Sequence, residues 1–128
     1  MILDTDTISY YLRGSETVKA QMVRHRHQLA STTINYAELL FGLKKRDTKR
    51  YLPHVEQVFA NITVYPFDRH AAALFSELKA RSHRTGKIVA DMDMMIAAIA
   101  IARDEILITN NLKHFSMIDG LQIESWYR

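Results

Sequence analysis

The sequence contains no cysteine, so disulfides and any metal site built on thiolates are excluded. No apolar stretch approaches the roughly 20 residues that a membrane span requires. The first residues also lack the charged, apolar and small-residue regions of a signal peptide. With no repeat, linker or low-complexity segment either, these absences predict a cytoplasmic protein that has no membrane partner.

The composition that remains is that of a globular protein with a basic excess. Hydrophobic residues make up 48% of the 128 positions and charged residues 24%, which suits a single domain over 1–128 with a core of its own. The net charge is +3, and the basic residues concentrate in 13–50 and 69–87. A basic surface predicts a polyanionic partner such as nucleic acid, although a solvated basic face would explain the charge equally well.

Short apolar runs alternate with helical patterns, which predicts an α/β fold with a mainly parallel sheet. The predicted strands are 1–3, 28–32, 62–65, 106–109 and 121–124. The predicted helices are 7–12, 15–26, 33–43, 47–60, 68–84 and a segment within 86–103, followed by a turn at 110–115. In the helix at 33–43, the apolar spacing places four residues on the core side: Ile34, Ala37, Leu40 and Phe41.

The segment GKIVADMDMMIAAIAIAR, at 86–103, is apolar on all sides except for two acids, so it predicts a largely buried helix. A buried carboxylate needs a partner, which is either the N-terminus of the helix or a divalent metal. Residues two apart on a helix point in nearly opposite directions. Asp93 is therefore the predicted site acid, and Asp91 is the predicted N-cap or first-turn residue.

Several oxygen-bearing residues follow predicted strands, and sites in open α/β sheets form at the carboxyl ends of strands. Asp4 ends the first strand, and Asn111 lies just after the fourth. Together with Asp93 and Glu38 they would form a pocket of the kind that Mg²⁺ or Mn²⁺ prefers. Taken singly, each has a plainer interpretation: Asp4 and Asn111 as turn residues, and Glu38 as a surface residue.

Four segments resemble PIN-domain ribonucleases of the VapC toxin type, and together they cover nearly the whole chain. They read ILDTDTISYYL, STTINYAELLFGL, GKIVADMDMMIAAIA and ILITNNLKHFSMIDGLQIESW. The resemblance implies a PIN-like three-layer fold, with a central mainly parallel sheet flanked by helices. It also implies Mg²⁺- or Mn²⁺-dependent endonucleolytic cleavage of RNA by the toxin component of a type II toxin–antitoxin module.

The resemblance also implies roles for individual residues. The metal-holding acids fall on Asp4, Glu38 and Asp93, and the fourth catalytic position falls on Asn111, where many PIN domains have Asp. Asp6 stands where the first motif usually has Asn, so it either reaches the metal through water or merely caps the next helix. Four residues are candidates for accessory roles: Thr5, Asp6, Asp91 and Thr109.

The implied partners are RNA, a VapB-type antitoxin and a second copy of the chain. Because sequence-specific RNA readers favour loops, a structured RNA such as tRNA is the expected substrate. Five basic residues are candidates for phosphate contacts: Lys44, Lys45, Arg46, Arg81 and Arg84. Four apolar residues of the first helices are candidates for antitoxin contact, with core packing as the alternative: Ile8, Leu12, Val18 and Met22.

Two other functions remain open. Residues 2–7 also fit the DxDxT opening of haloacid-dehalogenase-type phosphatases, which would make Asp4 a nucleophile. That family places its later acids after the strand equivalent to 106–109, whereas Asp91 and Asp93 precede it. The second alternative is a non-catalytic RNA- or partner-binding PIN module.

Overall fold

A computed structural model describes residues 1–127, in which five short strands form one sheet. The strands are β1 (Ile2–Leu3), β2 (Ala30–Thr32), β3 (Thr63–Tyr65), β4 (Leu107–Ile108) and β5 (Ile123–Glu124). Their spatial order is β3-β2-β1-β4-β5, and every neighbouring pair is parallel. The predicted fold class is therefore confirmed.

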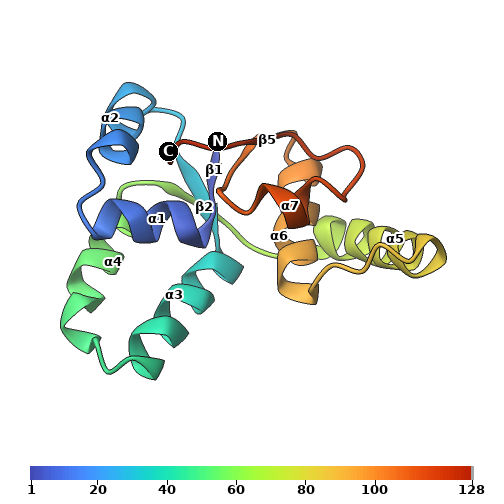
Figure 1. The fold of residues 1–128 in the computed structure, drawn as a ribbon, viewed down its shortest axis with the longest axis horizontal. Coiled ribbons are helices and arrows are strands. Elements are labelled where there is room, and N and C mark those ends of the chain that lie inside the picture. Colours follow the sequence, from blue (N-terminus) through green and yellow to red (C-terminus); the bar gives the residue numbers. More distant parts are fainter. Residues whose placement is uncertain (128) are drawn as a thin grey trace.

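Helices cover both faces of the sheet, which gives three layers (Figure 1). The first group is α1 (Thr5–Leu12), α2 (Glu16–Arg24), α3 (Thr33–Lys45) and α4 (Leu52–Ala60), with a 3₁₀ turn η1 (Lys49–Tyr51) before α4. The second group is α5 (Arg69–Thr85), α6 (Asp91–Ala102) and the short α7 (Leu112–Phe115). No helix within residues 1–127 combines the length and apolar character that crossing a membrane would require.

The two-residue strands divide the interior into two cores, because successive side chains of a strand point to opposite faces. Ile2 and Leu107 belong to the core under α5 and α6, and Leu3 and Ile108 to the core under α1 to α4. Two aromatic residues near the C-terminal end, Phe115 and Trp126, are also buried in these cores, at 0% and 5% exposed. Both layers of helices are thus anchored through the same two central strands.

The carboxyl ends of β1 and β4 lie side by side at one edge of the sheet. Leu3 pairs with Ile108, and the Asp4 backbone N–H donates to the Ile108 carbonyl at 2.9 Å. The chain leaves β1 toward β2 and β3 on one side, while β4 and β5 lie on the other, so β1 and β4 flank the topological switch point. Ligand sites of open parallel sheets form at this location.

Several helix starts differ from the predicted ones. Ser15 and Asp68, the first residues of two predicted helices, cap α2 and α5 through their side chains. However, α1 begins two residues early, at Thr5, with Asp4 as its N-cap residue. Thr32 caps α3 in place of Thr33. Thr32 serves because it still has extended backbone at the end of β2, the conformation that an N-cap residue needs.

The predicted helix at 47–60 is wrong in its first part. Asp47 has a φ of 53° and so lies in the left-handed region, which ends α3 and does not begin a new helix. Regular α-helix resumes only at Leu52, and Pro53 occupies its first turn. Proline fits there because the first N–H groups of a helix have no partner within it.

Candidate active site

Asp4 lies at the centre of a buried polar cluster at the switch point. Its side chain is held on both sides: Oδ1 accepts from Asn35 Nδ2 at 2.9 Å, and Oδ2 accepts from the Thr109 hydroxyl at 2.7 Å. The residue is 6% exposed, and burial raises the pKa of its carboxyl from 3.8 to about 7. The Asp6 and Glu38 carboxylates also raise this pKa, while the Thr109 hydrogen bond lowers it.

Asn35, in the first turn of α3, connects Asp4 to its surroundings and was not predicted from the sequence. It is fully buried, and its Nδ2 donates to Thr5 Oγ1 at 3.0 Å as well as to Asp4. Its Oδ1 accepts from the Thr32 hydroxyl at 2.7 Å. The one clue in the sequence is that Asn35 precedes Glu38 by three residues in the segment STTINYAELL, which would place both on the same side of the helix. Hydrophobic periodicity alone does not indicate a buried amide.

Glu38 and Asp93 reach the same cluster from α3 and α6. Glu38 is half-buried, and its Oε1 accepts from the Thr5 hydroxyl at 2.7 Å. Burial raises the pKa of Glu38, and the Asp93 and Asp6 carboxylates raise it further. Burial likewise raises the pKa of Asp93, with His114 acting to lower it. Of the predicted acids, Glu38 is therefore close enough to repel both Asp4 and Asp93.

Asp6 is a fourth acid of the cluster. Its Oδ2 accepts from the backbone N–H of Asn110 at 3.0 Å, which joins α1 to the segment after β4. Burial raises the pKa of Asp6, partly offset by the hydrogen bonds from Asn110 and Thr7. The Asp6 carboxylate in turn raises the pKa of three other acids, because it lies near them: Asp4, Glu38 and Asp93.

Asn111 is connected to the acids through a histidine. Its Nδ2 lies 3.0 Å from His114 Nδ1, and the same ring nitrogen is 3.9 Å from Asp93 Oδ2. The Asn111 backbone N–H donates to Thr109 Oγ1 at 3.0 Å. His114 is an exposed residue that was not predicted as part of the site. It lies three residues after Asn111 on the single turn of α7, which brings it to the site.

Asp91 points away from this cluster. It is the first residue of α6, where Ala90 is the N-cap, so of the two predicted positions the first turn is correct. Its carboxylate pairs with Lys79 of α5 at 3.1 Å and its side chain is 56% exposed. The expected division of Asp91 and Asp93 between opposite sides of the helix is thus observed, as a turn of about 100° per residue requires.

The donor chemistry of the cluster fits a hard divalent cation. Within residues 1–127, no three carboxylate or imidazole side chains already converge as a closed metal cage. Mg²⁺ does not need one, because it keeps several waters and commonly uses only one or two protein carboxylates. Asp4, Asp6, Glu38 and Asp93 form a cluster of like charges in which such a cation would reduce the repulsion.

The candidate phosphate-binding residues lie farther out. Lys44, Lys45 and Arg46 are exposed at the C-terminal end of α3, and Arg81 and Arg84 are exposed near the end of α5. These two helix ends diverge on opposite sides of the molecule (Figure 1). Lys45 is seven residues beyond Glu38, or roughly 10 Å along the helix axis. Any phosphates that they contact would therefore be distant from the acids.

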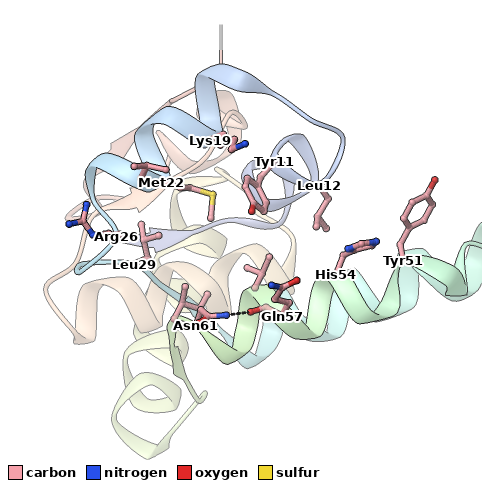
Figure 2. Close-up of a pocket in the computed structure, with 13 residues that line it drawn as sticks. Tyr11, Leu12, Lys19, Met22, Arg26, Leu29, Tyr51, His54, Gln57 and Asn61 are labelled. Carbon is pink, nitrogen blue, oxygen red and sulfur yellow. Dashed lines mark hydrogen bonds between the residues drawn. The ribbon is translucent and has the colours of Figure 1, made fainter.

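A groove of about 550 Å³ lies away from the acids, between α4 and the pair formed by α1 and α2 (Figure 2). Its walls are mostly apolar, with Lys19 and Arg26 from α2 and the following turn at its upper side and His54 on α4 opposite. None of the acids belongs to its lining. The groove is therefore a second surface feature and not the chemical site.

Two of the four candidate antitoxin contacts are excluded by burial. Ile8 and Val18 are 0% exposed and pack in the core with Leu3. Their helices present these residues inward, so the core-packing alternative is correct for both. Leu12 and Met22 do line the groove and remain candidates.

The fold and the cluster define a parallel α/β protein with an acidic site at its switch point, and comparison with known proteins gives the family. The model of the PIN domain matches residues 1–121. The chain is 30% identical over 127 residues to the tRNA(fMet)-specific endonuclease VapC of Salmonella typhimurium, covering 98% of this chain and 96% of the relative. It is 28% identical to a ribonuclease VapC of Haemophilus influenzae, with the same coverage.

Solved structures agree with the sequence comparison. The DNA-bound VapBC complex of Salmonella typhimurium matches with a TM-score of 0.92 at 30% identity, covering 98% of this chain and 97% of that one. VapBC2 of Rickettsia felis, bound to a DNA fragment from its promoter, matches with a TM-score of 0.89 at 25% identity and 98% coverage of both chains. The chain belongs to the PIN-domain family and is of the VapC type, which confirms the resemblance.

Proposed function

We propose that this chain is a Mg²⁺- or Mn²⁺-dependent endoribonuclease that serves as the toxin of a type II toxin–antitoxin module. The observation that carries the proposal is the cluster of Asp4, Asp6, Glu38 and Asp93, in which the Asp6 carboxylate raises the pKa of each of the other three. The names of the VapC relatives as ribonucleases support RNA as the substrate. The phosphatase alternative belongs to a different family and is not favoured.

Asp4 and Asp93 would hold the cation, with Glu38 bound directly or through water. When bound, the cation supplies a Lewis acid that lowers the pKa of water and neutralises charge on the phosphate. Asn35 and Thr109 orient both oxygens of Asp4, and Thr5 orients Glu38. This orientation keeps the carboxylates in position before RNA binds, which is the contribution that a preorganised polar site makes to catalysis.

Asn111 and His114 would contact the RNA. Asn111 carries no charge, so it suits a hydrogen bond to substrate or water better than tight binding of a second cation. The exposed His114 ring lies between Asn111 and Asp93. The exposed cations at the ends of α3 and α5 would bind phosphates farther along a structured RNA such as tRNA.

The decisive experiment compares two acids of the same helix turn. Asp93→Asn is expected to reduce Mn²⁺-dependent cleavage of RNA by at least about a hundredfold, because it removes a charged ligand of the cation. Asp91→Asn is the matched control and should cleave at close to the parental rate, since Asp91 faces Lys79. Cleavage is measured on cellular RNA with purified protein, with and without a chelator.

Equal cleavage by the parent and Asp93→Asn would remove Asp93 from the site. Cleavage that persists in a chelator would contradict the cation. If the parent cuts no RNA and Mn²⁺ at millimolar concentration leaves its melting temperature unchanged, the non-catalytic module is favoured, because a native-state ligand stabilises by mass action. A trapped phosphoryl group on Asp4 would instead support the phosphatase.

We also propose that the groove binds an apolar helix of a VapB-type antitoxin. The structural matches to VapBC complexes support such a partner. Apolar walls suit one face of an amphipathic helix, and Lys19 and Arg26 favour acidic residues beside that face. The homodimer implied by the resemblance stays a prediction.

Val23→Asp is expected to weaken antitoxin binding by at least about tenfold while RNA cleavage is retained. Val23 lines the groove and is 56% exposed, so the substitution places a charge on the binding surface without burying it in the core. Ile88→Asp is the matched control, because Ile88 is 61% exposed and lies outside the groove. Binding is measured by calorimetry with purified antitoxin. Equal loss in both variants would count against the groove.

A further inference from the structure

Two tyrosine rings lie face to face next to the acidic cluster. The centroids of Tyr10 and Tyr127 are 3.6 Å apart, and the ring planes differ by 4°. Aromatic pairs in protein interiors generally prefer offset or edge-to-face arrangements. A parallel pair at the surface, with 40% of Tyr127 exposed, presents a flat aromatic surface to solvent.

The pair is held in position from the chain segment that follows β5. The Ser125 hydroxyl donates to Asn110 Oδ1 at 3.0 Å, and Asn110 Nδ2 lies 3.5 Å from the Tyr10 hydroxyl oxygen. Trp126, between Ser125 and Tyr127, is buried in the core under α1 to α4. Tyr127 is therefore attached to a fixed residue on its N-terminal side, and its ring has a defined place over Tyr10.

The same residues connect the pair to the acids. Tyr10 is four residues after Asp6, so both side chains lie on the same side of α1. Asn110, which contacts the Tyr10 hydroxyl, donates its backbone N–H to Asp6 Oδ2 at 3.0 Å. Asp6 and Tyr10 are therefore both in contact with Asn110, the residue that joins the tyrosine pair to the acids.

The exposed part of the tyrosine pair is suited to binding a nucleotide base. One face of Tyr127 is covered by Tyr10, so its exposed area belongs to the other face and the ring edge. Arg13 lies over the other face of Tyr10, with its guanidinium carbon 5.0 Å from that ring centroid, and so supports the pair from behind. An open aromatic face is the feature on which proteins stack an unpaired base.

We propose that Tyr127, supported by Tyr10, stacks on one unpaired base of the RNA close to the phosphate that is cut. The proposal rests on the proposed function and adds a feature of the substrate: the strand must be single, or flipped out, at that base. Stacking accepts every base, because each has a π face. Tyr127 thus positions the strand and selects against duplex RNA.

The test uses single-stranded RNA of about 12 nucleotides, with the fluorescent base 2-aminopurine at one position at a time, and Ca²⁺ in place of Mg²⁺. On binding the parent, the fluorescence at one position is expected to be quenched by the stacked ring. Tyr127→Ala should lose this quenching and bind about tenfold more weakly. Tyr127→Phe keeps the ring and should behave as the parent does. Ile88→Ala, which removes an exposed apolar side chain outside the groove, is the surface control.

The proposal is overturned if Tyr127→Ala quenches and binds as the parent does, or if Tyr127→Phe loses as much as Tyr127→Ala. Melting temperatures of the variants identify a loss that comes from unfolding. In that case Tyr127→Leu, which keeps an apolar side chain over Tyr10 but has no ring, decides between stacking and packing: loss of the quenching in folded Tyr127→Leu supports stacking, and retention of it overturns the proposal. Failure of the parent to cut RNA in Mn²⁺ would contradict the proposed function alone, because the quenching is measured without cleavage.

Discussion

Replacement of Asp4 by asparagine is expected to abolish RNA cleavage and yet stabilise the metal-free protein at about pH 8. Asp4 is the buried centre of the acidic cluster, where burial and two neighbouring carboxylates raise its pKa to about 7. Loss of a charged cation ligand should reduce the rate about a thousandfold, which corresponds to roughly 4 kcal/mol of transition-state stabilisation. The same substitution removes a buried negative charge, which is where the stability gain comes from.

The sign of the pH dependence follows from the direction of the shift. Because the pKa of Asp4 is higher in the folded protein than its ordinary value of 3.8, the folded state holds the proton to a higher pH than the unfolded state does. Stability from this group is complete below about pH 4 and is lost as the pH rises toward 7, at about 1.4 kcal/mol per pH unit. Above that pH the loss is constant, on the order of 4 kcal/mol.

Part of the gain in Asp4→Asn will be offset. An asparagine can accept from Asn35 Nδ2 with its carbonyl oxygen, but its amide then faces Thr109, whose hydroxyl loses its acceptor. An unsatisfied buried hydroxyl costs about 1–3 kcal/mol. The net gain at pH 8 is therefore expected to be about 2 kcal/mol. It should fall to zero at about pH 5 and become a loss of about 2 kcal/mol near pH 4, where only the cost at Thr109 remains.

The measurement is urea unfolding of the parent and Asp4→Asn in a chelator across this pH range, repeated with Mn²⁺. Mn²⁺ should stabilise the parent and leave Asp4→Asn almost unchanged, so the order of stability reverses. Asp119→Asn, at an exposed carboxylate, is the control and should follow the parent in both series. A parent whose stability rises between pH 4 and pH 7 in the chelator would contradict the shift of Asp4.

Asp4 and Asp93 could be predicted from the sequence because each stands next to, or within, a segment that is otherwise apolar. Asp4 directly follows an apolar run, and Asp93 interrupts a helix that is otherwise apolar, so either residue stands out against its own segment. The parallel order of the strands then brings them to one edge. The same reasoning separated Asp91 from Asp93, because it depends only on the helical repeat.

The inward face of α3 could not be predicted in this way. The apolar spacing favoured Ile34, Ala37, Leu40 and Phe41, yet Ala37 is exposed and Phe41 is 64% exposed. The fully buried residue of the first turn is instead the polar Asn35. Its amide is fixed by partners on β2 and after β1, so a tertiary hydrogen-bond network sets the rotation of the helix. Such a network exists only once distant segments have met, and no local pattern in the sequence reports it.

Substitution of Asn35 by alanine should therefore destabilise the protein more than any exposed change. It would remove the present partner of three polar atoms, of which the first two are buried and the third is partly buried: Asp4 Oδ1, Thr32 Oγ1 and Thr5 Oγ1. The loss of these hydrogen bonds and the space that opens should lower the free energy of unfolding by about 3 kcal/mol. Cleavage should also fall, because neither Asp4 nor Thr5, which orients Glu38, remains fixed.

Asn61→Ala provides the matched control. Asn61 is exposed at the end of α4, where its amide donates to the Gln57 carbonyl at 2.7 Å, and its loss should change stability by at most about 0.5 kcal/mol. Urea midpoints and cleavage rates are compared at a urea concentration where both variants are folded. If Asn35→Ala is folded under these conditions and still cleaves more slowly, the loss comes from misplaced acids and not from unfolding. If Asn35→Ala unfolds at the same urea concentration as Asn61→Ala and cuts RNA equally fast, the amide neither orients Asp4 nor sets the rotation of α3.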